Sequence, residues 1–550
     1  MSRVLGINAV FHDPAAALVV DGETVAAAEE ERYSRRKHGK QAVPFSAWEL
    51  PVAAAKFCLG QAGIAAEEVD AVTYSYDPAL AKAVGATTDE LIADEWEGLR
   101  TLYAERAPRF LAAALPGLDP DRFRFVPHHV AHAGSAHLAS PYRDSAVLVL
   151  DGRGEAASHL GGWARGGDLE VLATQRLPHS LGLLYEDLTE HLGFHRSSDE
   201  YKVMALASYG DRDRFAAVLQ DAVRADGEGG FRVEPIDLAS LAPYRAPGKP
   251  MEGDHADLAA AVQMRLEEVV LDLARWLHAK TGERALTMAG GVALNCVANA
   301  RLAEEGPFDH VWVQPAAGDA GTALGGALAV AHELGDDVVP LRGADLGSGW
   351  TDDELEEAVR TSGWPYERPR DLAAAVAQRL AEGDVIGWFE GRSEYGPRAL
   401  GHRSLLVDPR DPANLQRMND IKGRESFRPV APMVTLERAA EIFEGVIPSP
   451  YMLFVHRVRP EWRDRVAAAV HVDGTARAQT VDRRDEPVMA RVLDEFGART
   501  GVPVLINTSF NTAGRPIVDS PREALECFGA GPIGTLVLGP FVVKRSRLAA

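Results

Sequence analysis

Two segments of this chain share one layout, and this repetition constrains the fold more than any other feature. The first, VLGINAVFHDPAAALVVDGETVAAAEEER, spans 4–32, and the second, AVLVLDGRGEAASHLGGWARGGDLEVLATQR, spans 146–176. In both, an apolar strand runs into a turn that carries Gly, Asp or His, and a second strand follows. Two such hairpins, about 140 residues apart, predict an internally duplicated α/β domain.

ATPases of the actin, hexokinase and Hsp70 class have this duplicated plan, in which each half presents a hairpin turn to the nucleotide phosphates. A turn that is rich in backbone N–H groups and poor in bulky side chains suits such a contact. Helical spacing of Leu and Val predicts a helix over 257–282, followed by a strand and the glycine turn GGVALN at 290–295. The segment 311–330 repeats the order strand, turn and helix, which places ligands at the carboxyl ends of strands.

Gly, Asp and Pro cluster without periodicity at 335–352, so we expect two domains, 1–343 and 344–550. The second has its own strands and helices, including a helix at 372–382. The sequence contains no run of 18 or more apolar residues, so no membrane-spanning helix is predicted. Three scattered cysteines and the absence of a signal-peptide pattern predict a cytoplasmic protein.

The net charge is −22, with 46% hydrophobic and 25% charged residues, which is typical of a soluble globular protein. A protein that grips nucleic-acid phosphates over a broad surface would normally be basic. The charge therefore favours small-molecule chemistry over a nucleic-acid partner.

The segment PHHVAHAGSAH at 127–137 holds four histidines. If it is helical, His128 and His132 stand at i and i+4 and share one face, which is the spacing of two imidazoles on one metal ion. Asp151 ends an apolar strand and Asp319 lies in the GDAGT turn, where carboxylates would reach inward. Such His₂Asp₂ ligation fits iron or zinc. His129 and His137 are interpreted as structural.

Two further N-terminal features have open alternatives. His12, in the first hairpin turn, could take a proton from a substrate hydroxyl. The adjacent Asp13 could instead simply cap the turn. The charged run EEERYSRRKHGK at 29–40 could be a solvated loop, or Lys37 or Arg36 could meet a phosphate.

Basic residues gather in the C-terminal third of this acidic chain, including the KGR triplet at 422–424 and SFRP at 426–429. Arginine suits bidentate binding of phosphate oxygens, although surface salt bridges are the alternative. The motif NTSFN follows an apolar strand and supplies neutral donors, Asn507, Thr508, Ser509 and Asn511.

Ordered motifs give the chain a family resemblance over nearly its whole length: HDPAAALVVDG, EEERYSRRKHG, HHVAHA, LDGRGE, EYKVMALASYG, GGVALN, GDAGTALGGAL, GRSEYGPRALGHRSLLVDPR, ESFRPVAPMV, HVDGTARAQTV and NTSFN. The chain resembles the O-carbamoyltransferases that modify antibiotics and nodulation factors. The N-terminal part of that family resembles the ATPase-like fold of tRNA threonylcarbamoyl transfer. Its C-terminal part resembles the YrdC-like domain of threonylcarbamoyl-AMP synthase.

The resemblance implies a carbamoyltransferase that forms carbamoyl-AMP from carbamoyl phosphate and ATP with release of pyrophosphate. The C-terminal domain would catalyse this step with Mg²⁺. The residues expected to bind carbamoyl phosphate and ATP are Arg398, Lys422, Arg424, Arg428, Arg477, Ser509 and Asn511. Of these, Lys422 and Arg424 would be catalytic. The N-terminal domain would then carbamoylate a hydroxyl of a small molecule, with His12 as base. The residues implied for its nucleotide are Lys37, Gly152, Glu200, Gly290, Gly291 and Asn295, and those for its Fe²⁺ or Zn²⁺ are His128, His132, Asp151 and Asp319.

The acceptor has no readable motif, although 75–120 and 210–256 look like variable segments on the substrate side. The expected acceptor is an antibiotic or another secondary metabolite. No nucleic-acid or membrane partner is expected, and formation of a homodimer is left open. Three rivals remain: an actin-like sugar kinase, a tRNA-modifying enzyme that uses the same adenylate, and a nucleotide-gated scaffold without turnover.

Overall fold

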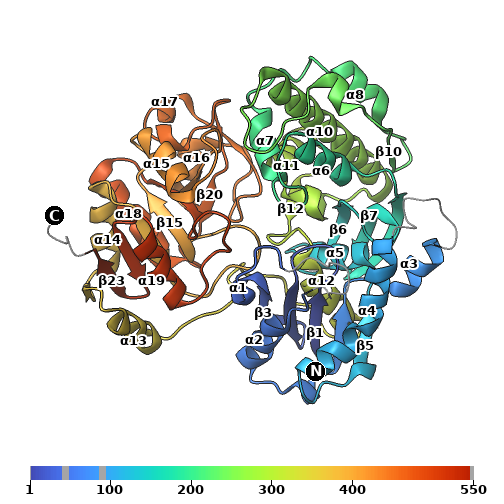
Figure 1. Ribbon diagram of the computed structural model, residues 1–550, viewed down its shortest axis with the longest axis horizontal. Helices are drawn as coiled ribbons and strands as arrows, with labels where there is room; N and C mark the ends of the chain where they lie inside the picture. The colour runs from blue at the N-terminus through green and yellow to red at the C-terminus, as the bar shows by residue number, and fades with distance from the viewer. Residues whose placement is uncertain (1, 40–48, 86–94, 546–550) are drawn as a thin grey trace. The chain divides into compact units, whose positions relative to one another are not determined.

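A computed structural model describes residues 2–39, 49–85 and 95–545 of the chain (Figure 1). The chain divides into two compact units, an N-terminal unit, Met1–Arg342, and a C-terminal unit, Gly343–Ala550.

Two five-stranded sheets of the same topology form the framework of the N-terminal unit. Their strand orders are β3-β2-β1-β4-β5 and β8-β7-β6-β11-β12. In each sheet the first three strands in chain order pair antiparallel with their neighbours. The fourth strand pairs parallel with the first, and the fifth pairs parallel with the fourth. The strands are β1 Arg3–Asn8, β2 Ala15–Val20, β3 Glu23–Glu29, β4 Ala71–Tyr74 and β5 Phe123–Phe125, then β6 Asp144–Leu150, β7 Ala157–Arg165, β8 Asp168–Arg176, β11 Ala285–Ala289 and β12 His310–Val313. The duplication predicted from the two hairpins is confirmed.

Helices complete each half of this unit. Those of the first half are α1 Glu31–Ser34, α2 Val52–Ala62, α3 Pro78–Gly85, α4 Glu95–Ala114 and α5 His128–His137. Those of the second half are α6 Leu181–His191, α7 Glu200–Ala207, α8 Ala216–Ala222, α9 Leu238–Leu241, α10 Gly253–Thr281, α11 Cys296–Glu305 and α12 Ala320–Glu333, with a small hairpin of β9 Val223–Ala225 and β10 Phe231–Val233. The helix predicted over 257–282 is α10, which begins four residues earlier and ends at Thr281, where Gly282 caps it with φ +67°.

The helices α5 and α12 each follow the last strand of their half, and they pack against each other (Figure 1). Glycines allow the two backbones to touch. A Cβ on Gly325 of α12 would lie 1.8 Å from the carbonyl oxygen of Ala131, and one on Gly134 of α5 would lie 2.6 Å from the carbonyl oxygen of Gly325. This close approach brings the first turn of α5 toward Asp319, the residue that precedes α12.

We expect Gly325→Ala to lower the free energy of unfolding by about 1–3 kcal/mol, because the added methyl group forces two packed helices apart. The matched control is Gly98→Ala in α4, where a Cβ would meet nothing within 4 Å. That control should be neutral or stabilising by up to about 1 kcal/mol, because alanine is the better helix former. Urea unfolding of both variants measures the difference, and equal effects would contradict the backbone contact.

An eight-stranded sheet organises the C-terminal unit, in the order β13-β23-β22-β14-β15-β21-β16-β20. Its strands are β13 Tyr366–Glu367, β14 Ile386–Phe389, β15 Arg403–Val407, β16 Ala431–Thr435, β20 Gln479–Val481, β21 Val504–Ser509, β22 Thr535–Leu538 and β23 Phe541–Lys544. The helices are α13 Asp352–Ser362, α14 Leu372–Ala381, α15 Ala413–Lys422, α16 Leu436–Ile442, α17 Pro460–Arg463, α18 Pro487–Thr500 and α19 Pro521–Ala530. A three-stranded sheet joins β17 Phe443–Glu444, β18 His456–Val458 and β19 Thr475–Ala476.

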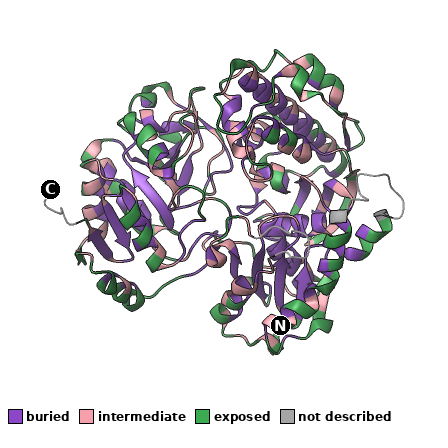
Figure 2. Ribbon diagram, viewed as in Figure 1, coloured by how far each residue is buried: buried purple, intermediate pink, exposed green. Residues whose placement is uncertain are grey.

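Burial follows this layout in both units, since the central strands are buried while the outer helices keep an exposed face (Figure 2). In the C-terminal unit, α14 and α18 pack apolar side chains against one set of strand residues, and α19 packs against another. Within the described residues, no helix is both long and apolar enough to cross a membrane.

Candidate functional site

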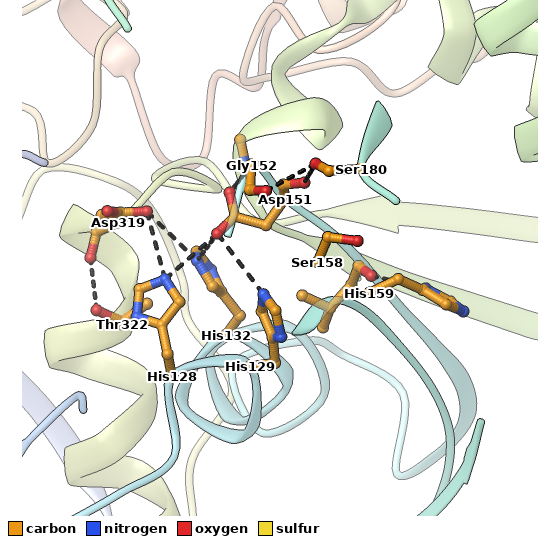
Figure 3. A network of polar contacts seen from close by, with 12 residues as sticks. His128, His129, His132, Asp151, Gly152, Ser158, His159, Ser180, Asp319 and Thr322 are labelled. Carbon is orange, nitrogen blue, oxygen red and sulfur yellow. Dashed lines mark hydrogen bonds and ion pairs between the residues drawn. The ribbon is translucent and has the colours of Figure 1, made fainter. Parts of the chain in front are cut away.

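The first turn of α5 carries the histidines of a buried polar cluster. His128 is the first residue of α5, and His132 follows one turn later on the same face. Both side chains are fully buried. Figure 3 shows them directed toward Asp151, which follows β6, and Asp319, which precedes α12. The structure thus brings together the four residues predicted as metal ligands.

The distances in this cluster are those of groups that share an ion. The Nε2 atom of His128 lies 3.3 Å from Oδ2 of Asp151 and 3.6 Å from Oδ1 of Asp319, and Nε2 of His132 lies 3.6 Å from each of the same oxygens. Ligands that each stand about 2.1 Å from one metal lie roughly 3.4 Å apart. The four residues offer ligand atoms that all lie within 4.8 Å of one another.

The hydrogen bonding of the cluster also fits a metal ion. Within the described part of the chain, the Nε2 atoms of His128 and His132 are buried without a hydrogen-bond partner. Such groups destabilise a fold unless something binds them. The Nδ1 of His128 lies 3.1 Å from the carbonyl oxygen of Ser75, which directs Nε2 into the cluster.

Both carboxylates are held in their charged form. Burial alone would raise the pKa of Asp151, but the imidazoles of His128, His129 and His132 hold it well below the usual range. Burial likewise opposes ionisation of Asp319, and His128 and His132 lower its pKa. The backbone N–H of Gly291 donates to Oδ1 of Asp151 at 2.9 Å, so Oδ2 remains directed at the histidines.

A third histidine, for which the sequence carried no site signal, lies beside the cluster. His129, interpreted as structural, has its Nε2 buried without a hydrogen-bond partner among the described residues and 3.7 Å from Oδ2 of Asp151 (Figure 3). No spacing signal marks it, because residues i and i+1 on a helix do not share a face. The ring of His137 lies between the carbonyl oxygens of Ala133 and Gly167, as expected for a structural histidine.

The first hairpin turn lies beside this cluster. Phe11 packs edge-on against the ring of His128, with 4.9 Å between the ring centroids. His12 follows, and its Nδ1 lies 2.9 Å from Oδ2 of Asp13. Burial lowers the pKa of His12, but the charge and hydrogen bond of Asp13 outweigh it and raise the pKa to about 9.

The residues expected around a nucleotide are spread over several turns of the N-terminal unit. Lys37 is exposed after α1, and Glu200 is the first residue of α7. Burial raises the pKa of Glu200 to about 7, and the charge of Glu186 adds to the effect.

The glycine turn after β11 lies against the end of β6. A Cβ on Gly290, which has φ +95°, would meet the carbonyl oxygen of Leu150 at 2.1 Å, so only glycine fits this approach. The carbonyl of Gly152 accepts a hydrogen bond from Ser180. The side chain of Asn295 caps α11 and exchanges hydrogen bonds with Gln263, which occupies its polar atoms.

A second polar cluster lies in the C-terminal unit at the end of β21. Lys422, the last residue of α15, is buried, and its ammonium group donates to the Ser509 hydroxyl at 2.9 Å and to Asn511 Oδ1. The Ser509 hydroxyl in turn donates to Asn511 Oδ1 at 2.8 Å. The structure therefore joins two motifs, KGR and NTSFN, that lie about 85 residues apart in the sequence.

A buried amide pair links the segments that carry two of the predicted arginines. Asn507 donates to the carbonyl oxygen of Ala399 and to Oε1 of Gln479, and Gln479 donates to the carbonyl oxygen of Leu400. Arg398 directly precedes Ala399 and Arg477 lies two residues before Gln479. Asn507 was expected to donate to a ligand, but its amide instead joins these segments to β21.

Of the remaining arginines, Arg424 and Arg428 follow α15, and Arg477 lies between β19 and β20. Arg424 donates through Nε to the side chain of Asn419, and Arg428 forms an ion pair with Glu425 at 3.6 Å. The Nε of Arg477 is buried and has no hydrogen-bond partner among the described residues. Arg424 and Arg428 lie within six residues of Lys422 in the sequence, and cations grouped in this way suit the binding of an anion.

Both units match one family of known proteins. Residues 3–328 match the family described as "Carbamoyltransferase N-terminus", and residues 377–545 match "Carbamoyltransferase C-terminus". The chain belongs to the carbamoyltransferase family. As expected from the motifs, it is a carbamoyltransferase.

Relatives of this carbamoyltransferase span nearly its whole length. Nodulation protein NolNO of Sinorhizobium fredii (strain NBRC 101917 / NGR234) is 40% identical, with 98% of this chain and 80% of that protein covered. The uncharacterized protein sll1178 of Synechocystis is 38% identical, with 99% and 97% covered. Among solved structures, HypF of T. kodakarensis aligns with a TM-score of 0.39 and 14% identity over 60% of this chain and 47% of that chain, which is too low to define a shared fold.

Proposed function

We propose that this carbamoyltransferase activates carbamoyl phosphate as carbamoyl-AMP in its C-terminal unit and transfers the carbamoyl group to a small-molecule hydroxyl in its N-terminal unit. The observation that carries the proposal is the presence of two separate clusters, each suited to phosphate chemistry. One is the His128, His132, Asp151 and Asp319 group, and the other surrounds Lys422.

The atoms of the first step define its products. Carbamoyl-AMP contains one phosphate, which ATP supplies when a carbamate oxygen attacks its α-phosphorus and pyrophosphate leaves. The phosphate of carbamoyl phosphate must therefore depart as inorganic phosphate, with one water consumed. One pyrophosphate and one phosphate should appear for each carbamoyl group activated.

In this step Lys422 and Arg424 would stabilise charge on the reacting phosphates, with Mg²⁺ bound to the ATP. Ser509 and Asn511 position the ammonium group of Lys422. Arg398, Arg428 and Arg477 would bind the remaining phosphate oxygens. We also propose that this unit has a YrdC-like fold, which is supported by the hydrogen bonds between the KGR and NTSFN motifs.

The second step forms a carbamate ester. The acceptor oxygen attacks the carbamoyl carbon, the bond from that carbon to the adenylate oxygen breaks, and AMP leaves. His12 would accept the hydroxyl proton. Lys37, Gly152, Glu200, Gly290, Gly291 and Asn295 are proposed to surround the nucleotide. The duplicated sheets support an actin-like ATPase fold for this unit.

His128, His132, Asp151 and Asp319 would hold a divalent metal ion, and His₂Asp₂ ligation suits Fe²⁺ or Zn²⁺. Such an ion supplies positive charge that stabilises negative charge on a phosphate oxygen. The protein provides the orientation of these ligands through Ser75 and Gly291.

The proposed acceptor is a hydroxyl-bearing secondary metabolite such as an antibiotic. This proposal is supported by the family and by relatives that are named nodulation proteins. A sugar kinase would instead release ADP. A tRNA-modifying enzyme would bind nucleic acid, which a net charge of −22 disfavours.

The test is incubation with ATP, carbamoyl phosphate, Mg²⁺ and a panel of antibiotic precursors, followed by mass spectrometry. We expect an acceptor that gains one carbamoyl group, with equal amounts of AMP, pyrophosphate and phosphate. Formation of ADP in place of AMP would overturn the proposed route.

A further inference from the structure

A second group of polar side chains in the N-terminal unit joins three segments that are distant in sequence. Asp13 lies in the turn between β1 and β2, His38 follows α1, and Ser198 precedes α7. The Nδ1 of His12 lies 2.9 Å from Oδ2 of Asp13, and the Nδ1 of His38 lies 2.9 Å from Oδ1 of the same residue. The Nε2 of His38 lies 3.0 Å from the Ser198 hydroxyl. The carboxylate of Asp13 thus bridges two imidazoles.

The backbone at this group is strained at three positions. Asp13, His38 and Ser197 have φ values of +44°, +61° and +57°. Residues other than glycine adopt this region at a cost of about 1–3 kcal/mol, and such strain gathers at functional sites. Since one residue from each of the three segments is strained where the segments meet, turn chemistry alone does not account for the arrangement.

Side chains hold each strained position in place. Asn8 donates to the carbonyl oxygens of His12 and Asp13 at 2.8 and 3.0 Å. Glu31 accepts the backbone N–H of His38 at 2.8 Å, and Glu200 accepts that of Ser197 at 2.7 Å. Three polar side chains therefore serve to fix the geometry around Asp13.

The contacts of Asp13 with His12 and His38 have the lengths of ordinary hydrogen bonds, and the same three residues also offer ligand atoms close enough together to hold a metal ion. Distances of 2.9 Å are normal for N–H···O bonds, whereas the nitrogens and oxygens of the His128 cluster stand 3.3–3.6 Å apart. Both ring nitrogens of His38 have a partner. In His12, by contrast, Nδ1 contacts Asp13, whereas Nε2 has no hydrogen-bond partner among the described residues. The side chain of His12 is 27% exposed.

We infer that Asp13 and His38 are positioning residues that hold His12 with a proton on Nδ1 and leave Nε2 as the nitrogen that reacts. This inference rests on the proposed function, in which His12 is the base of the transfer step. Asp13 orients the imidazole, and His38, anchored by Ser198, orients Asp13 from the other side. Neither residue touches the reacting atoms.

The role follows from the chemistry of the transfer. The hydroxyl proton passes to Nε2 of His12 as the acceptor oxygen bonds to the carbamoyl carbon and the bond to AMP breaks. The imidazolium formed is stabilised by the Asp13 carboxylate, which helps to raise the pKa of His12 to about 9. Nε2 can accept the proton only when His12 is deprotonated, so the transfer rate should rise with pH toward about 9. The other charged groups whose fields raise the pKa of His12 are Asp319 and Glu200.

The test compares Asp13→Asn and His38→Asn with Asp21→Asn. Asparagine tolerates positive φ, so the backbone should be retained in each variant. Asp21, with φ +53° in the exposed turn before Gly22, is the matched control. We expect Asp13→Asn to lower kcat for carbamoyl transfer by about 100-fold or more, with KM for the acceptor and the rate of pyrophosphate release unchanged. His38→Asn should have a smaller effect of the same kind, and Asp21→Asn none.

A pH profile separates positioning from a structural defect. Loss of the Asp13 carboxylate should lower the pKa of His12, so the acidic limb of the Asp13→Asn profile should move to lower pH. An unchanged limb with a uniformly reduced rate would overturn the inference.

His12→Ala distinguishes this inference from the proposed function. Normal transfer by His12→Ala would remove the base role and hence the proposed second step. Loss of transfer in His12→Ala together with full activity in Asp13→Asn and His38→Asn would overturn only the positioning role. Two metal ions per chain, one of which is lost in His38→Asn, would also contradict it.

Discussion

His128→Gln should nearly abolish carbamoyl transfer and leave the formation of carbamoyl-AMP intact, because His128 is one of the four proposed metal ligands. Glutamine approximates the size of histidine but replaces the imidazole Nε2, which lies 3.3 Å from Asp151 and 3.6 Å from Asp319, with an amide group that binds a divalent metal more weakly. With that ligand weakened, His132 and the two buried carboxylates hold an ion less tightly. We expect the transfer rate to fall by roughly 100- to 1000-fold, the range typical of losing one preorganised charge-stabilising group.

The measurement combines the carbamate product, pyrophosphate release and the metal content of the purified protein. The control is His310→Ala, at an exposed histidine of the same unit that stacks on Tyr142. That variant should keep its metal and its activity. Carbamate product at the parental rate from metal-depleted His128→Gln would contradict the role of the cluster.

Lys422→Met should abolish pyrophosphate release when ATP and carbamoyl phosphate are supplied. The ammonium group of Lys422 is held by Ser509 and Asn511 at the end of β21, so its position is fixed before substrates bind. Methionine retains much of the side-chain length and removes the charge. Loss of one such preorganised group should slow adenylate formation by roughly 100- to 1000-fold.

The control for this variant is Lys544→Met, because Lys544 forms a surface ion pair with Glu367 in the same unit. Surface pairs of this kind contribute about 1 kcal/mol or less, so activity should be unchanged. If carbamoyl-AMP prepared separately is supplied, Lys422→Met should still carbamoylate the acceptor. Normal pyrophosphate release by Lys422→Met would remove Lys422 from the first step.

Much of the fold could be predicted because its signals are local. The two hairpins appear as β1 to β3 and β6 to β8, and the helix expected to stop at Gly282 ends at Thr281 with Gly282 as its cap. The partners of the parallel strands could not be predicted from the sequence. β12 corresponds to the predicted strand at the start of 311–330, but nothing in the sequence specifies its neighbour, and β5 has only three residues, too few for a periodicity that distinguishes it from a loop.

The site was predictable where spacing or a strand end marked a residue. The i, i+4 pair His128 and His132 and the strand-end Asp151 are examples. His129 carried no such signal, and neither did the bridge from Asp13 to His38, since the latter depends on how separate segments meet. Asn507 was predicted to donate to a ligand, but its amide donates to the carbonyl oxygen of Ala399. The sequence does not distinguish an amide that binds a ligand from one that binds the backbone.

The contact between α5 and α12 determines more than packing. The histidines open one helix and Asp319 precedes the other, and the separation between the two is governed by the hydrogen atoms of Gly134 and Gly325. In the proposed metal site, selection among cations of different radius would thus depend on contacts about one or two turns away from the ligand atoms. We expect replacement of either glycine to change the ion preference of the proposed site even though all four ligands remain.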